Sequence, residues 1–269
     1  MSQTSGFVKK LAANDRKIRD AAFESLRKYL SSRSSSKLTL LEMEKLWKGL
    51  YYSMWLCDRP RPQERLAESL AQLYSEVIPV AAFSDFTEAF WVIMIREWPN
   101  IDQWRVDKFY LLIRRVLRHN FKRLKNEKWS SKIVGSFLSI YEKYPLSGDK
   151  SVSVALPYHI CDIYLDELEL VIFEEVKDKQ QALDEQEKKD MTKYQELVKQ
   201  KIEIASQIPI QKLISPFQKL NKDCPLKTLR EKCKEEVLDD ERLKDWGVFE
   251  SEDSDSEEDD EEDDWEGFN

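Results

Sequence analysis

The chain has 269 residues, of which 41% are hydrophobic and 11% aromatic, so it can bury a substantial core without disulfide bonds. Six glycines and nine prolines are few for this length, which favours helices over turn-rich sandwiches and barrels. The four cysteines form no CxxC pair, and no apolar run approaches the roughly 18 residues of a membrane span, so we expect a reducing compartment and neither a secreted nor a membrane-spanning protein.

The charge is divided between two regions of the sequence. Residues 250–269 contain 13 Asp or Glu and no Lys or Arg. The preceding residues hold 43 Lys or Arg against 38 Asp or Glu, a net charge of +5, although the whole chain carries −8. We therefore expect a mildly basic body that can approach a polyanion, followed by a disordered acidic tail over residues 250–269.

Apolar residues at helical spacing predict seven helices in the first 176 residues. The first runs from Asn14 to Leu30, with Asn14 or Asp15 as its N-cap, and the second follows a capping box formed by Thr39 and Glu42. The remaining five are expected at about 63–78, 85–98, 102–124, 131–144 and 157–173. Short links between them favour an all-α fold, an irregular α-solenoid of HEAT- or armadillo-like antiparallel helix pairs. An ordinary helical bundle is the alternative, because no repeat of about 35–45 residues is visible.

Changes in apolar periodicity and in charge along the sequence predict four regions. Residues 1–176 form the helical-repeat-like body, and residues 177–193, almost all charged or amide up to Lys193, form a linker or an exposed helix. Apolar periodicity resumes over residues 194–249, where we expect helices that dock on the body or on a partner, the last at about 226–238. The acidic tail completes the sequence given.

Patterns of catalysis and metal binding are missing from the sequence. The two histidines are His119 and His159, and His159 with Cys161 has no second ligand pair at metal-binding spacing. The segment Gly148-Asp149-Lys150-Ser151 resembles the end of a phosphate-binding loop, but it lacks the first glycine and the preceding strand, so we interpret it as a turn. We expect no enzyme activity, no cofactor, no metal and no small-molecule substrate.

The helix expected from residue 102 to residue 125 is the most informative interior segment. One face is apolar, and the opposite side is basic over about a quadrant of the helical wheel. The candidate binding residues on that side and just beyond it are Lys108, Arg114, Arg115, Arg118, Lys122, Lys125 and Lys128, continued by Lys132. Such a stripe can track nucleic-acid phosphates without reading sequence, although an ordinary solvated helix face or a surface for acidic proteins would have the same pattern. Because these residues lie off the apolar face, we expect that Arg115, Arg118 and Lys122 can be changed to Glu without loss of folding.

The eight tryptophans fall into groups with different expected environments. Trp47, Trp55 and Trp91 lie on apolar stripes and are expected in the core, whereas Trp98, Trp104 and Trp129 lie at helix ends, where a partner could reach them. Trp265 and Phe268 in the acidic tail are either a short linear binding element or simple tail composition.

Two serines of the tail are candidate phosphorylation sites. Ser254 and Ser256 each have an acidic residue three positions further on, which resembles the pattern used by acidophilic kinases. Phosphorylation there would add negative charge to an acidic segment.

Three segments resemble, in the same order, the ribosomal RNA-processing protein 1 family of nucleolar proteins: LAANDRKIRDA at 11–21, LWKGLYYSMW at 46–55 and IDQWRVDKFY at 101–110. Residues 225–240 also resemble the closing segment of that family. The resemblance implies a scaffold of the nucleus and nucleolus that assists assembly of the large (60S) ribosomal subunit and maturation of precursor rRNA. Its partners would be other assembly factors of the pre-60S particle and the phosphate backbone of precursor rRNA, with no membrane. The alternative is a helical-repeat adaptor that binds only proteins, with its acidic tail acting as a nucleic-acid mimic or as a chaperone of basic proteins.

Overall fold

The computed structural model describes residues 3–32, 37–185 and 191–249. These residues are folded into helices and contain no strand, which confirms the all-α prediction. The predicted disorder of residues 250–269, the serines Ser254 and Ser256, and the aromatic residues Trp265 and Phe268 lie outside the described residues.

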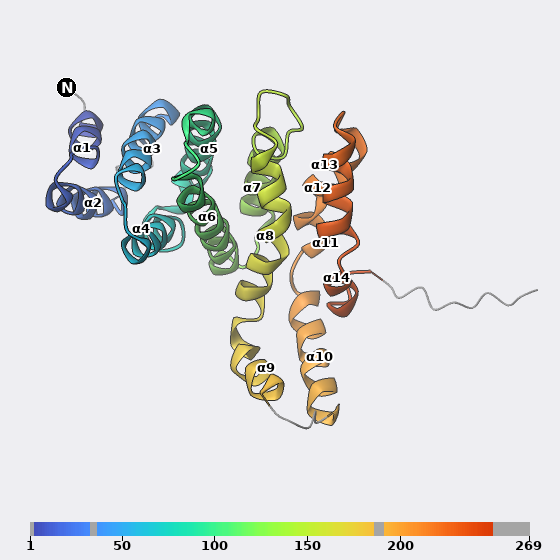
Figure 1. The fold of residues 1–269 in the computed structure, drawn as a ribbon. Helices are drawn as coiled ribbons and strands as arrows, with labels where there is room; N and C mark the ends of the chain where they lie inside the picture. Colours follow the sequence, from blue (N-terminus) through green and yellow to red (C-terminus); the bar gives the residue numbers. More distant parts are fainter. Residues whose placement is uncertain (1–2, 33–36, 186–190, 250–269) are drawn as a thin grey trace, which may run out of the picture.

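The helices follow one another with short connections (Figure 1). In chain order they are α1 (Gln3–Leu11), α2 (Arg16–Leu30), α3 (Leu40–Trp55), α4 (Pro60–Gln72), α5 (Val80–Glu97), α6 (Val106–Asn126), α7 (Ser131–Lys143), α8 (Ala155–Ile172), α9 (Lys177–Asp184), α10 (Met191–Ser206), α11 (Ile210–Leu213), α12 (Ser215–Asp223), α13 (Lys227–Cys233) and α14 (Glu241–Asp245). A π-helical segment extends α4 (η2, Leu73–Val77) and another extends α13 (η5, Lys234–Leu238), while 3-10 turns follow α5 (η3, Trp98–Asn100) and α8 (η4, Glu174–Val176).

Local side-chain bonds explain where several of these helices begin. The Asp15 carboxylate accepts from the backbone N–H of Lys17 at 2.7 Å and caps α2. The capping box of α3 is present, because Thr39 Oγ1 accepts from the Glu42 N–H at 3.3 Å and the Glu42 carboxylate accepts from the Thr39 N–H at 3.0 Å. Both predicted caps are therefore confirmed.

Some boundaries differ from the prediction. Helix α6 begins at Val106 rather than at Asp102, because the Asp102 carboxylate closes the preceding turn by accepting from the Trp104 N–H at 3.0 Å. Helix α5 begins at Val80, directly after Pro79, several residues before the expected start at 85. The short helices α1 and α14 were not predicted from the periodicity.

The first eight helices pack in two ranks. In one rank α3 lies between α1 and α5, and α5 also contacts α7; in the other, α6 lies between α4 and α8. Helix α2 packs on α1 and contacts the second rank at η2. Figure 1 shows these helices arrayed side by side along the molecule. Helix α6 thus occupies the middle of its rank, with neighbours on both sides.

The C-terminal helices continue the packing. Helix α12 contacts α7, and α13 contacts α8, where Cys161 Sγ lies 3.6 Å from Cys233 Sγ. The Tyr164 hydroxyl donates to the carbonyl of Leu213 at 2.7 Å, and the Trp246 ring packs on Phe173. Helix α9 occupies part of the region expected to be a linker or an exposed helix, and it contacts α10. The division into units at residue 176 stays a prediction.

Aromatic side chains fill much of the interior. Trp47 and Trp91 are each 1% exposed, and the Trp47 ring contacts the rings of Tyr74, Phe86 and Phe90. Trp55 is half-buried at the edge of this core. Of the three tryptophans expected within reach of a partner, Trp104 is 83% exposed and Trp129 is half-buried, whereas Trp98 is buried. The prediction that a partner could reach Trp98 is therefore wrong, because the Trp98 side chain in η3 packs against the Tyr110 ring.

Candidate nucleic-acid interface

Lys108 does not belong to an exposed basic stripe. Its side chain is buried, and its Nζ donates to the carbonyl of Trp55 at 2.6 Å and to the carbonyl of Cys57 at 2.9 Å. These carbonyls end α3, where backbone acceptors lack helical partners and a positive charge is favourable. Burial lowers the pKa of the Lys108 ammonium. The prediction that Lys108 contacts RNA or a partner is corrected, because α3 covers it.

Arg114 and Arg118 bind a buried carboxylate on the next helix of the rank. Glu167 of α8 is fully buried, and it accepts from Arg114 Nε at 2.5 Å and from Arg118 Nη2 at 3.0 Å, with a second contact to Arg118 Nε. Arg114 also donates to Asp166 at 3.1 Å. Changing Arg118 to Glu would place a second carboxylate beside Glu167. The expectation that this position tolerates charge reversal without loss of folding is therefore incompatible with the packing.

Arg115 and Lys125 also face neighbouring helices. Arg115 Nε lies 3.5 Å from the Glu68 carboxylate on α4. Lys125 Nζ donates to the carbonyl of Val171 at 2.9 Å, near the end of α8, and lies 3.8 Å from the carboxylate of Glu174. Both cations therefore stabilise contacts within the rank, although each side chain remains partly exposed.

Arg123 is a structural cation that sequence reasoning missed. It is 8% exposed, and its guanidinium donates to the carbonyl of Tyr74 at 2.7 Å and to that of Ile78 at 2.5 Å. These acceptors lie at the end of the π-helical extension of α4. The only sequence signal was that Arg123 adjoins Leu124, at the border of the apolar face. Arg123, Lys108 and Lys125 thus bind the C-terminal ends of three different helices.

Three cations near the end of α6 remain available to a partner. Lys122, Lys128 and Lys132 have no ion-pair partner within 4.0 Å among the described residues. Lys128 and Lys132 are exposed, and Lys122 is half-buried. Lys128 and Trp129 have φ of 52° and 53°, so the turn after α6 uses the left-handed region at two successive non-glycine residues. What is left of the predicted stripe is a short basic cluster, which we call the α6–α7 cluster: Lys122, Lys128 and Lys132.

The histidines serve the packing of the ranks. His119 Nδ1 lies 2.7 Å from Ser75 Oγ and its Nε2 lies 2.9 Å from the Glu68 carboxylate, while His159 Nε2 lies 3.1 Å from the carbonyl of Tyr110. Burial lowers the pKa of both imidazoles. Within residues 3–32, 37–185 and 191–249, no group of three or more His, Cys, Asp or Glu side chains is placed to hold a metal ion. No helix in the same ranges has the length and apolarity needed to cross a bilayer.

Comparisons with known proteins relate the chain to a nucleolar family. The sequence pattern of the family described as nucleolar protein Nop52 matches residues 2–267. The chain is 41% identical over 168 residues to the human ribosomal RNA processing protein 1 homolog B. This match covers 61% of this chain and 22% of the human protein. It is 38% identical over 164 residues to the mouse homolog A, and this match covers 60% of this chain and 33% of the mouse protein. It is 33% identical over 164 residues to the Caenorhabditis elegans homolog, and this match covers 61% of this chain and 41% of the C. elegans protein. The matched part of the chain therefore spans less than half the length of each of these relatives.

Proposed function

Because the chain belongs to the Nop52 family of nucleolar proteins, we propose that it acts as a non-catalytic scaffold in the processing of ribosomal RNA. The nucleolar location agrees with the sequence prediction. The observation that carries the proposal is the match over residues 2–267, which includes both ranks of helices. In finer detail, the scaffold assists assembly of the large (60S) subunit and binds other assembly factors of the pre-60S particle together with precursor rRNA.

We infer that the two ranks form an irregular α-solenoid. The support is the alternation of contacts: α3 packs between α1 and α5, while α6 packs between α4 and α8, so successive helix pairs are added along one direction. A stack of this kind exposes a long surface relative to its core. Such a surface can hold several proteins and an RNA segment at fixed relative positions, which is what a scaffold requires.

We propose that the α6–α7 cluster makes the contact with rRNA phosphates. Of the seven predicted binding residues, Lys108, Lys122 and Lys128 have no ion-pair partner in the described part of the chain, but Lys108 is buried against two carbonyls. Lys122 and Lys128 are therefore the two that can reach a partner, and Lys132 lies near them in sequence. Arg114, Arg115, Arg118 and Lys125 keep part of their surface exposed, so they add positive potential while serving the packing. Each unpaired cation that displaces counterions from RNA contributes salt-sensitive affinity.

The first experiment tests the scaffold itself. The tagged full chain is expressed in cells depleted of their own copy, and gradient sedimentation with precursor-rRNA probes is followed by crosslinking. We expect co-sedimentation with large-subunit precursors, and RNA crosslinks within residues 105–132. Absence of the chain from precursor particles would contradict the scaffold. Protein crosslinks alone at residues 105–132 would favour the adaptor that binds only proteins.

The second experiment tests the cluster with charge reversals that avoid internal ion pairs. The triple variant Lys122→Glu, Lys128→Glu and Lys132→Glu should fold normally and lose RNA crosslinks within residues 105–132. The matched control carries Lys199→Glu, Lys212→Glu and Lys244→Glu, three exposed lysines on α10, α11 and α14. Equal crosslinking of the two variants would remove the cluster from the proposal.

Mapping of phosphate on Ser254 and Ser256 from the same preparation tests the predicted modification.

A further inference from the structure

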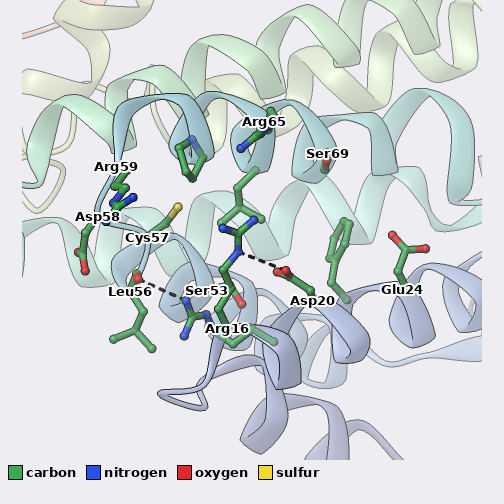
Figure 2. Close-up of a pocket in the computed structure, with 14 residues that line it drawn as sticks. Arg16, Asp20, Glu24, Ser53, Leu56, Cys57, Asp58, Arg59, Arg65 and Ser69 are labelled. Atoms are coloured by element: carbon green, nitrogen blue, oxygen red, sulfur yellow. Dashed lines mark hydrogen bonds and ion pairs between the residues drawn. The ribbon is translucent and has the colours of Figure 1, made fainter.

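A groove lies between α2 and α4, beside the α3–α4 turn (Figure 2). It exists because α4 packs along α6 but makes few contacts with α2. Its volume is about 480 Å³, within the range typical of ligand-binding clefts, about 300–1,000 Å³. Figure 2 shows Arg59 and Arg65 on the α4 side of this groove, and Arg16, Asp20 and Glu24 on the α2 side.

The arginines of the groove hold positive charge that the described carboxylates cancel only in part. Arg59 and Arg65 are exposed and have no ion-pair partner within 4.0 Å among the described residues. Arg19 donates to the carbonyls of Ala13 and Asn14, both at 2.8 Å, and these neutral acceptors hold the guanidinium in place without neutralising it. Arg16 lies 3.3 Å from the Asp20 carboxylate, but their side chains are 64% and 63% exposed, so this pair contributes little.

The groove also has an apolar component. Phe23, Pro62 and Leu66 contribute to its lining, and Phe23 is 9% exposed. Guanidinium groups match phosphate geometry, and an apolar surface accommodates the face of a base or a ribose. The combination suits a nucleotide unit better than an isolated inorganic anion.

The carboxylates of the groove distinguish RNA from an acidic peptide. Asp20, Glu24 and Asp58 also line the groove. They repel RNA phosphates and acidic side chains alike, but ionised Asp and Glu side chains offer no donors, so an acidic peptide has only its backbone N–H groups for these carboxylates. Ribose 2′-hydroxyls and base amino groups do offer donors, and they are accessible in a single strand. RNA can therefore satisfy the arginines with its phosphates and the carboxylates with its donors.

We propose that the groove between α2 and α4 binds a single-stranded RNA segment, with Arg59 and Arg65 on its phosphates. This site is separate from the α6–α7 cluster, and the choice of RNA as ligand rests on the proposed function. Arg19 fixes positive charge at the α2 side of the groove, while Asp20 and Glu24 accept from sugar or base donors.

The test measures binding of the purified full chain to a fluorescein-labelled single-stranded RNA of about ten nucleotides, a length within the span of common single-strand sites. The double variant Arg59→Glu and Arg65→Glu should bind at least about tenfold more weakly, and the slope of log affinity against log salt should fall by about 1.4, the value for two lost phosphate contacts. The matched control, Lys199→Glu with Lys212→Glu, should change affinity by less than about twofold. Equal effects of the two variants, or no binding by the unchanged chain, would overturn the proposal.

Two further measurements test whether the loss of binding is specific to the groove and to RNA. Helical circular dichroism checks that the variants are folded, and Arg59→Gln with Arg65→Gln should weaken binding in the same direction without introducing new carboxylates. An oligoglutamate peptide of similar length should fail to displace the RNA; displacement at similar concentration would overturn RNA as the ligand in favour of an acidic peptide.

The outcome is distinguishable from that of the scaffold proposal. A chain that binds RNA through the groove but never sediments with precursor particles contradicts the scaffold alone. A chain that sediments with those particles, but whose RNA affinity is unchanged by the Arg59 and Arg65 substitutions, contradicts the groove alone.

Discussion

Glu167 is the residue on which the contact between α6 and α8 depends most directly. Its carboxylate is fully buried and accepts from Arg114 and Arg118, whose side chains remain 38% and 20% exposed. Replacement of Glu167 by Ala leaves two guanidinium groups without their buried partner. We expect a loss of about 2–4 kcal/mol in the free energy of unfolding, at the lower end of the cost of breaking a buried pair because the arginines keep some solvent. Urea denaturation followed by circular dichroism measures this change.

The neighbouring residue Asp166 provides the matched control for Glu167. It pairs with Arg114 at 3.1 Å and with Arg242 at 3.0 Å, but its side chain is 41% exposed. Asp166→Ala should therefore cost no more than about 1 kcal/mol. If the two substitutions cost the same, burial of Glu167 does not determine the strength of the contact.

The two histidines predict how stability depends on pH. Burial lowers the pKa of His119 and His159 below the ordinary value of 6.5. The unfolded chain then binds protons more readily than the folded chain, so stability is retained above about pH 6.5 and falls as the pH decreases towards 5. The loss cannot exceed about 1.4 kcal/mol per pH unit for each histidine.

Urea denaturation at a series of pH values measures the histidine effect. The double variant His119→Gln and His159→Gln should show a flatter dependence between pH 6.5 and 5, whatever its absolute stability. Carboxylates titrate in the unchanged chain and in the variant alike, and mostly at lower pH, so they do not account for a difference between the two slopes. An unchanged slope in the variant would assign the pH dependence to other groups.

At the scale of the elements, α6 joins three helices by binding their C-terminal ends. Arg123 donates to two carbonyls at the end of the π-helical extension of α4. Arg123→Leu should leave both carbonyls without this donor and lower the free energy of unfolding by about 2–3 kcal/mol. Lys122→Leu is the adjacent control, and it should change stability by no more than about 0.5 kcal/mol because Lys122 has no such partner in the described residues. Thermal unfolding of the two variants makes the comparison, and similar midpoints would show that Arg123 does not hold this junction.

The helices were predictable because their signals are local. The caps at Asp15 and Thr39 each depend on residues within three positions, and the apolar period of α6 is contained in its own sequence. The short helices α1 and α14 carry too few apolar positions to establish a period, and their conformation depends on packing against later or earlier parts of the chain.

The use of the basic residues was not predictable, because their partners are distant in sequence. Lys108 binds carbonyls more than 50 residues earlier, and Arg118 binds Glu167, 49 residues later. A helical wheel reports that a residue lies away from the apolar face, but in the middle of a rank both flanks of that face are covered by neighbours. Most cations of the predicted stripe are therefore engaged with α3, α4 or α8, while the α2–α4 groove draws its arginines from two segments that no local pattern connects.

At the scale of the whole molecule, the division of charge predicts how the chain binds a polyanion. Residues 250–269 bring the net charge from +5 to −8. Removal of these residues should strengthen binding of the single-stranded RNA probe several-fold at low ionic strength, because a net negative charge on the chain no longer repels the probe. The gain should shrink as salt rises and the Debye length falls to about 8 Å at physiological ionic strength.

Fluorescence anisotropy at two salt concentrations measures this effect, and a second variant separates charge from length. Replacement of residues 250–269 by a neutral Gly/Ser segment of equal length should reproduce the gain, since the charge is removed while the chain length is kept. A gain that appears only on truncation would indicate steric obstruction instead of repulsion. A gain that persists at high salt would contradict the electrostatic explanation, because screening weakens repulsion between exposed charges.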